Sequence, residues 1–181
     1  MTNRFWNLLL AGTFAGTFAL TSSSMAKEYP VGTPQTVAGM EIGAVYLQPI
    51  EMAPPGMMHD AKDSDVHLEA DIKAAKGNPN GFAQGDWIPY LSVDFELTKV
   101  GGATQKGVFM PMVANDGPHY GENVKMAGPG KYVLKLTVKP PGEHTHFGRH
   151  IDKETGVAEW FKPFTTEYEF TYAGAGKKGA Y

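Results

Sequence analysis

Apolar and polar residues alternate along several short stretches of the chain, which is the period expected of half-buried β-strands. The clearest stretch is 66–74, where every second side chain is apolar and the others are His, Glu, Asp and Lys. The stretches with this alternation are 40–47, 66–74, 90–98, 108–114, 132–138 and 166–172. Clusters of Gly and Pro separate them, and helical periodicity is weak throughout. The pattern predicts an all-β fold, a single antiparallel β-sandwich of immunoglobulin-like type without a disulfide, with a small barrel as the alternative.

Composition narrows the chemistry that this fold can carry. The 181 residues include 16 Lys and Arg against 19 Asp and Glu, so the net charge of −3 leaves no basic surface for nucleic acid. The chain has no Cys, which excludes disulfides, thiolate metal sites and a thiol nucleophile. It also has no nucleophile elbow, P-loop, zinc-protease motif or dinucleotide fingerprint. We therefore expect a binding protein without catalytic residues.

Residues 1–26 have the composition of a cleaved secretory signal peptide. Arg4 is the only charge before Lys27, and an apolar stretch over 5–20 leads to a polar segment that ends in Ala26. A membrane anchor is the alternative, but Gly and Thr interrupt the stretch, which is shorter than the roughly 20 apolar residues of a span. We predict export to the periplasm, a domain over residues 27–172 without a membrane span, and a flexible tail over 173–181.

Side chains able to bind metal are abundant after this predicted cleavage. Six His and seven of the nine Met remain. Imidazole with thioether suits copper, whereas imidazole with carboxylate suits Fe2+, Mn2+ or Zn2+. On the predicted strand 66–74, His67 and Glu69 project from the same face, which is competent for ligation and is extended by Asp71. The alternative is that these residues form the wet face of a half-buried strand.

A second group of candidates lies around a predicted turn. Met110 and Met112 share a strand face, and the Asp-Gly-Pro sequence at Asp116 predicts a turn that presents His119. Pro111 within the same stretch favours an edge strand or a bulge. A loop tip with these residues could close around one ion. The alternative is that the Met residues belong to the core and His119 is a turn residue.

Two further segments are rich in ligand-type residues. His144, His146 and His150 fall within seven residues after a Pro-Pro-Gly sequence, which predicts a loop and is a compositional metal signal. A surface His cluster without bound metal is the alternative. The segment 51–60 holds Met52, Met57, Met58 and His59 among prolines, and is either an auxiliary metal site or a hydrophobic lid.

Long motifs of the chain resemble the periplasmic Fe2+-transport family. They are GMEIGAVYLQPIEM (39–52), DVHLEADIKAAKGNPNGF (65–82), WIPYLSVDFEL (87–97), FMPMVANDGPHYGENVKM (109–126) and RHIDKETGVAEWFKPF (149–164). The resemblance extends from about residue 39 to 172. It implies a dimeric, immunoglobulin-like protein that binds copper and iron beside a membrane iron permease.

The resemblance also implies a ligand set. The copper ligands that it implies are His67, Met112, His119 and His150, the last donated by the partner subunit at the interface of a homodimer. Glu69 and Asp116 would serve an adjacent iron position. His144, His146 and Met110 are auxiliary candidates, since His144 or His146 could replace His150.

We therefore expect a periplasmic metal-binding protein that assists ferrous iron uptake, with copper and Fe2+ as its metals and Mn2+ or Zn2+ as substitutes. Copper-assisted oxidation of Fe2+ is a weaker variant of this hypothesis. A copper chaperone or copper-resistance protein without an iron role is the alternative function, and a structural sandwich domain with incidental His is a third.

Overall fold

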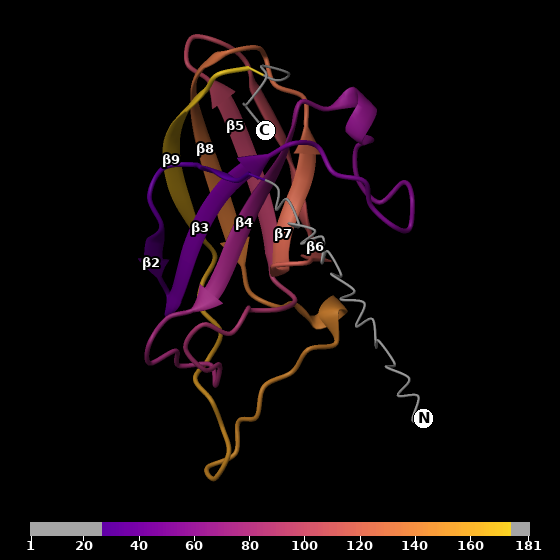
Figure 1. Cartoon of the computed structure of the whole chain (residues 1–181). Helices are drawn as coiled ribbons and strands as arrows, with labels where there is room; N and C mark the ends of the chain where they lie inside the picture. Colours follow the sequence, from indigo (N-terminus) through magenta and orange to yellow (C-terminus); the bar gives the residue numbers. More distant parts are fainter. Residues whose placement is uncertain (1–26, 175–181) are drawn as a thin grey trace, which may run out of the picture.

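The computed structural model describes residues 27–174, and strands make up most of this part of the chain (Figure 1). The strands are β1 Tyr29–Pro30, β2 Gln35–Val37, β3 Met40–Leu47, β4 Val66–Ala74, β5 Ser92–Lys99, β6 Thr104–Ala114, β7 Gly117–Val124, β8 Gly130–Lys139 and β9 Phe164–Tyr172. Two short 3-10 turns, η1 Ala61–Asp63 and η2 Glu143–Thr145, lie in the connections. The predicted signal peptide and residues 175–181 of the predicted tail lie outside the described residues.

Every paired strand runs antiparallel to its neighbours, in the order β1-β3-β4-β7-β6-β5-β8-β9, with β2 also on β3. β6 belongs to both layers: its first half pairs with β5 up to Phe109, and its second half pairs with β7 from Met110 onward. The two layers face each other in Figure 1. The predicted immunoglobulin-like β-sandwich is thereby confirmed, and the barrel alternative is not needed.

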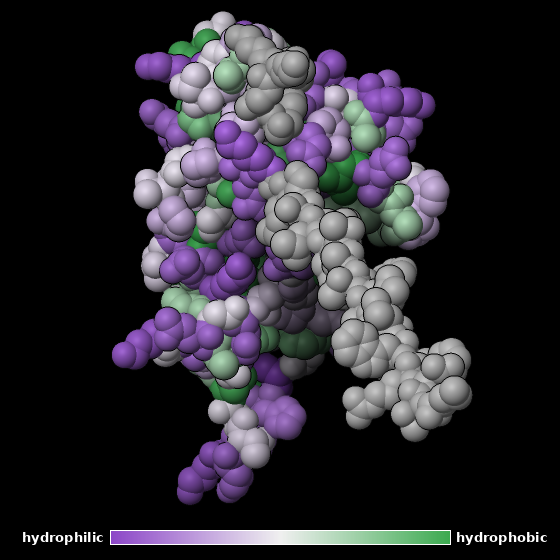
Figure 2. All heavy atoms as spheres, in the orientation of Figure 1, coloured by the Kyte–Doolittle hydropathy of each residue, from purple (hydrophilic) through white to green (hydrophobic). Residues whose placement is uncertain are grey.

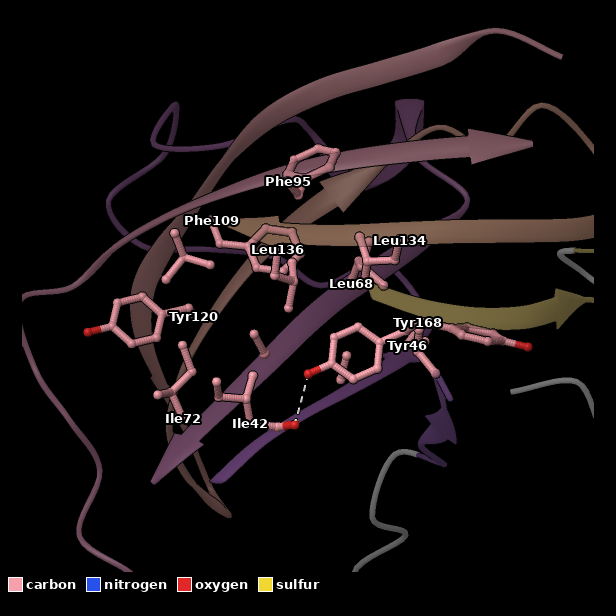
Figure 3. Close-up of a cluster of buried hydrophobic side chains, with 14 of the residues drawn as sticks. Ile42, Tyr46, Leu68, Ile72, Phe95, Phe109, Tyr120, Leu134, Leu136 and Tyr168 are labelled. Atoms are coloured by element: carbon pink, nitrogen blue, oxygen red, sulfur yellow. Dashed lines mark hydrogen bonds between the residues drawn. The ribbon is translucent and has the colours of Figure 1, made fainter. Parts of the chain in front are cut away.

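The core lies between the two layers and is built by alternate residues of each strand (Figure 3). Leu68 and Ile72 of β4 are fully buried, as are Leu134 and Leu136 of β8. Tyr168 of β9 donates a hydrogen bond of 3.0 Å from its hydroxyl to the carbonyl oxygen of Ile42, which ties the layers together. Without a disulfide, apolar burial supplies most of the stabilisation of this domain.

A second buried tyrosine fastens the loop that precedes β5. The Tyr120 hydroxyl donates to the Ile88 carbonyl oxygen at 2.7 Å and accepts a hydrogen bond from the Leu91 amide at 3.0 Å. Trp87 packs on its ring with centroids 5.2 Å apart. Burial raises the pKa of Tyr120 far above its usual value. These contacts of Tyr120 hold β7 against the loop before β5 on the side of β7 that faces the core.

The strands β1, β2 and β7 lie outside the stretches that the sequence predicted as strands, and β7 is the one that contributes to the site. Gly117-Pro118 begins β7 rather than forming part of a loop, and the turn consists of Asn115 and Asp116 alone. Pro118 is tolerated because it lies at the start of the strand. The edge-strand expectation raised by Pro111 is confirmed, because this half of β6 pairs only with β7.

The surface seen in Figure 2 mixes hydrophilic side chains with separate hydrophobic ones. Over residues 27–174, no helix has the length and apolar character needed to cross a bilayer. Figure 1 shows the long connection between β8 and β9 extending well beyond the end of the sandwich.

Candidate metal centre

The strands β1, β2, β3, β4 and β7 and the second half of β6 form one layer, the first sheet. Three potential ligands meet on its outward face. His67 and Glu69 project from β4, two residues apart, and His119 projects from the neighbouring strand β7. Glu69 Oε1 lies 3.4 Å from His67 Nε2 and 3.3 Å from His119 Nε2. One ligand atom from each residue falls within 4.8 Å of the other two, a spacing that suits a shared metal ion. The register of β4 and β7 creates this cluster.

The alternative that His67 and Glu69 lie on the solvent-exposed face of β4 is wrong. His67 is fully buried and Glu69 is 6% exposed, because the loop after β3 covers them. His119 is also buried, at 5% exposure, and lies within β7 rather than on a loop tip. The residue patterns predicted that the three side chains are exposed on a strand face and a loop tip, and only the family resemblance implied that they share a site.

The His67 ring is oriented by a neighbour that sequence reasoning missed. Asn123 donates from Nδ2 to the carbonyl oxygens of Ile50 and His59, at 2.8 Å each, and its Oδ1 accepts from the Ile50 amide at 3.2 Å. Its amide orientation is thus fixed, and Oδ1 also lies 3.1 Å from His67 Nδ1. His67 therefore carries its proton on Nδ1 and leaves the Nε2 lone pair free.

The Nε2 atom of His67 is buried and makes no hydrogen bond within the described residues. A buried polar atom without a partner costs free energy, unless it binds something that the chain itself does not supply. A metal ion satisfies this requirement. The residues present therefore fit a metal at this position.

Space for the His67 ring comes from Gly121 on β7. A Cβ atom at this position would lie 2.6 Å from His67 Nε2 and 2.9 Å from its Cε1. Real Cβ atoms essentially never make contacts this short. Glycine is required here because the imidazole lies directly over the backbone of β7, and the sequence alone gave no signal for this role.

Burial holds the cluster in its uncharged form. It lowers the pKa of His67 to about 4 and raises the pKa of Glu69 to about 8. It also lowers the pKa of His119. Neutral imidazoles are the form that binds metal, and a cation beside Glu69 stabilises its carboxylate.

A cavity of about 310 Å³ opens from these three residues. Met112 of β6 stands directly opposite His119 of β7, so both side chains leave the same face of the sheet. Met112 and Asp116 line the cavity together with the cluster, as does Met52 from the loop after β3. The donors around this space are the imidazoles of His67 and His119, the thioethers of Met112 and Met52, and several carboxylates, Glu69 and Asp116 among them.

A second cavity of about 480 Å³ shares Glu28, Glu69, Asp116 and His119 with the first. Its acidic lining residues include Asp71, Asp116 and Glu28, another residue that sequence reasoning missed. Burial raises the pKa of Glu28, and a hydrogen bond with Asp116 adds to this rise. Asp71 and Asp86 line this cavity and not the first, so the second cavity adds carboxylate oxygens to those that the two cavities share.

The other predicted ligands do not reach this cluster within one chain. His150 lies in the long β8–β9 connection with its side chain 74% exposed, and its Nδ1 lies 2.8 Å from Thr155 Oγ1. His146 is exposed beside η2, and the side chain of His144 lies outside what the structure describes. Met110 faces a separate cavity of about 400 Å³.

The family model for "Fe2+ transport protein" matches residues 25–174. The chain belongs to this family. Among curated relatives, a UPF0423 protein of Brucella abortus is 71% identical over 166 residues, which cover 90% of this chain and 91% of the relative. The 34 kDa membrane antigen of Treponema pallidum is 41% identical over 148 residues, 78% of this chain and 72% of the antigen.

Solved structures of similar proteins carry the same fold. Copper-reconstituted P19 of Campylobacter jejuni matches with a TM-score of 0.80 and 51% identity, over 83% of this chain and 99% of that protein. FetP of a uropathogenic Escherichia coli strain matches with a TM-score of 0.79 and 53% identity, over 83% and 99%. A variant of FetP has also been solved with copper bound.

Proposed function

We propose that this member of the Fe2+ transport family is a periplasmic copper-binding protein that assists the uptake of ferrous iron. The observation that carries the proposal is the free, buried Nε2 atom of His67, which points to the side chains of Glu69 and His119. The copper-bound structures of P19 and FetP support copper as the resident metal. The family name supports iron transport.

His67, His119 and Met112 would hold the copper. Two neutral imidazoles and one thioether accept both Cu+ and Cu2+, because they combine borderline and soft donors. The fourth ligand is His150 of a second copy, in a homodimer. Its exposure and its place in the projecting β8–β9 connection, beside Ile151 at 78% exposure, support a role in contacts between chains.

Ferrous iron, as cargo, would occupy the acidic side of the cluster. Glu69 is shared between the two cavities, and Asp116 lines both. Carboxylate oxygens suit Fe2+ better than a thioether does. From there a membrane permease would receive the iron, and the predicted signal peptide would place the protein in the periplasm.

Metal titration of the purified, untagged protein tests the two positions. Met112→Leu removes the soft ligand and should weaken Cu+ binding by at least about tenfold, with little effect on Fe2+. Glu69→Gln should weaken Fe2+ more than Cu+. Met110→Leu is the matched control, because Met110 leaves the same strand face but lines another cavity.

Equal losses for both metals in the Met112 and Glu69 variants would refute the division into two positions.

A deletion strain separates the iron role from the copper-chaperone alternative. We expect poor growth under iron starvation, restored by the wild-type gene and not by one encoding Glu69→Gln. Copper sensitivity with normal growth in low iron would favour the chaperone function instead.

Sedimentation should give a dimer, and a monomer with full copper affinity would exclude His150 of a second copy as a ligand.

A further inference from the structure

The loop between β3 and η1 contains three methionines and a histidine that the proposed function does not use. In Figure 1 this loop projects from the side of the first sheet, next to β4 and β7. A cavity of about 280 Å³ lies in it, and Met52, Met58 and His59 are among its lining residues. Both Met side chains are half-buried, whereas Met57 is 40% exposed and does not line the cavity.

The side chain of His59 is 78% exposed, unlike that of the buried His67, and a carboxylate lies beside its ring. Its Nδ1 lies 3.3 Å from Glu122 Oε1, and the same oxygen accepts a hydrogen bond of 3.0 Å from the His59 amide. The His59 carbonyl oxygen accepts from Asn123 Nδ2 at 2.8 Å. A carboxylate that fixes Nδ1 leaves Nε2 as the nitrogen available to a metal, which is the usual arrangement behind a metal-binding imidazole.

Consecutive residues of β7 thus orient two histidines in two cavities. Glu122 faces His59, and Asn123 faces His67. The cavities also share a wall, because Ile50, Glu51 and Met52 line both of them. Met52 is therefore the thioether that stands between the outer cavity and the buried cluster.

We infer that Met52, Met58 and His59 form a second metal site, selective for Cu+, at the outer side of this shared wall. Two thioethers and one imidazole bind a soft monovalent ion and disfavour Fe2+ and Zn2+. Asp60 in the same cavity is paired with Lys62 at 3.2 Å, so its carboxylate is balanced by a cation. The outer site would pass copper to the inner cluster through Met52, a role that rests on the proposed function.

The test is a Cu+ titration of the full mature protein under reducing, anaerobic conditions against a chromophoric Cu+ chelator. We expect two equivalents per chain for the wild type and one for the double variant Met52→Leu/Met58→Leu. Leucine keeps the apolar volume, so the loop should retain its fold, which a urea unfolding curve checks. Met57→Leu is the matched control and should keep two equivalents.

Sulfur scattering in the X-ray absorption spectrum gives a second measurement. The second Cu+ equivalent should show two sulfur neighbours in the wild type, whereas the single equivalent bound by the double variant should show only the sulfur of Met112. Conversely, His119→Ala should remove the inner equivalent and keep the outer one, so the two sites can fail separately. A wild type that binds one equivalent, lost with His119→Ala, would retain the proposed function and overturn the outer site, leaving the loop as a hydrophobic lid. Loss of an equivalent in Met57→Leu would overturn the ligand assignment.

Discussion

Replacing Gly121 by Ala should disturb the cluster through a single methyl group. The added Cβ would lie 2.6 Å from His67 Nε2 and 3.2 Å from the Leu68 carbonyl oxygen, whereas ordinary contacts begin at 3.4 Å. The imidazole would have to move by roughly 0.8 Å to restore normal contact. It has little room to do so, because it is fully buried and its Nδ1 is tied to Asn123.

The expected cost follows from overpacking. Forcing extra volume into a packed site destabilises a protein by about 1–3 kcal/mol. For a domain of this size each kcal/mol lowers Tm by about 2–4 °C, so the metal-free variant should melt about 2–12 °C below the wild type. Ligands need placement within about 0.5 Å, so copper affinity should also fall by at least about tenfold.

Urea unfolding of the metal-free protein and a competitive copper titration measure the two effects. Gly43→Ala is the matched control in the adjacent strand β3, because its Cβ would meet only Pro34 Cγ, at 3.8 Å. That change should leave copper binding intact and stabilise the chain by up to about 1 kcal/mol. If Gly121→Ala unfolds and binds copper like the wild type, the role assigned to the glycine is wrong.

Three other substitutions probe the supports around the site. Asn123→Ala leaves the His67 Nδ1 proton and backbone groups of the covering loop unpaired. Urea unfolding should therefore show a loss of about 3 kcal/mol in stability, and copper affinity should fall about 10–100-fold. Unchanged affinity would contradict the positioning role of Asn123. Tyr120→Phe should cost about 1–3 kcal/mol by the same assay yet spare copper binding, because the hydroxyl serves the core side of β7. Burial raises the pKa of Tyr168 above its usual 10.0, so stability present below pH 10.0 should be lost as the pH rises through the folded-state pKa. Tyr168→Phe should reduce that alkaline loss in unfolding curves without abolishing it, because burial also raises the pKa of Tyr120 and Tyr132. An unchanged pH profile would refute this assignment.

Alternation along the chain was sufficient to predict the sandwich, because most strands have one face in the core and one in solvent. It failed at β7, where residues 119–124 are buried on both faces. A strand covered on both sides has no alternating pattern, and Gly117-Pro118 at its start suggested a turn. The covering loop after β3 is the physical cause of this failure, since it buries the outward face of β7.

The candidate ligands could be found by residue type, but their supports could not. Imidazole and carboxylate are common metal ligands, which made His67, Glu69 and His119 candidates, and the family resemblance selected them as parts of one site. Asn123 and Gly121 have ordinary residue types, and their roles depend on the register between β4 and β7. That register is set by packing between distant segments, which no local pattern records.

The distance along the chain between His67 and Asn123, 56 positions, fixes when the protein can first hold its metal. The contact forms only after β4 and β7 have docked, a long-range pairing that comes late in the folding of β-proteins. In an unfolded chain His67 and His119 are not held side by side, so this site would retain a cation weakly. If the proposed function is correct, copper loading would follow the completion of folding, and a chain that stalls before β4 and β7 pair would remain without copper at this site.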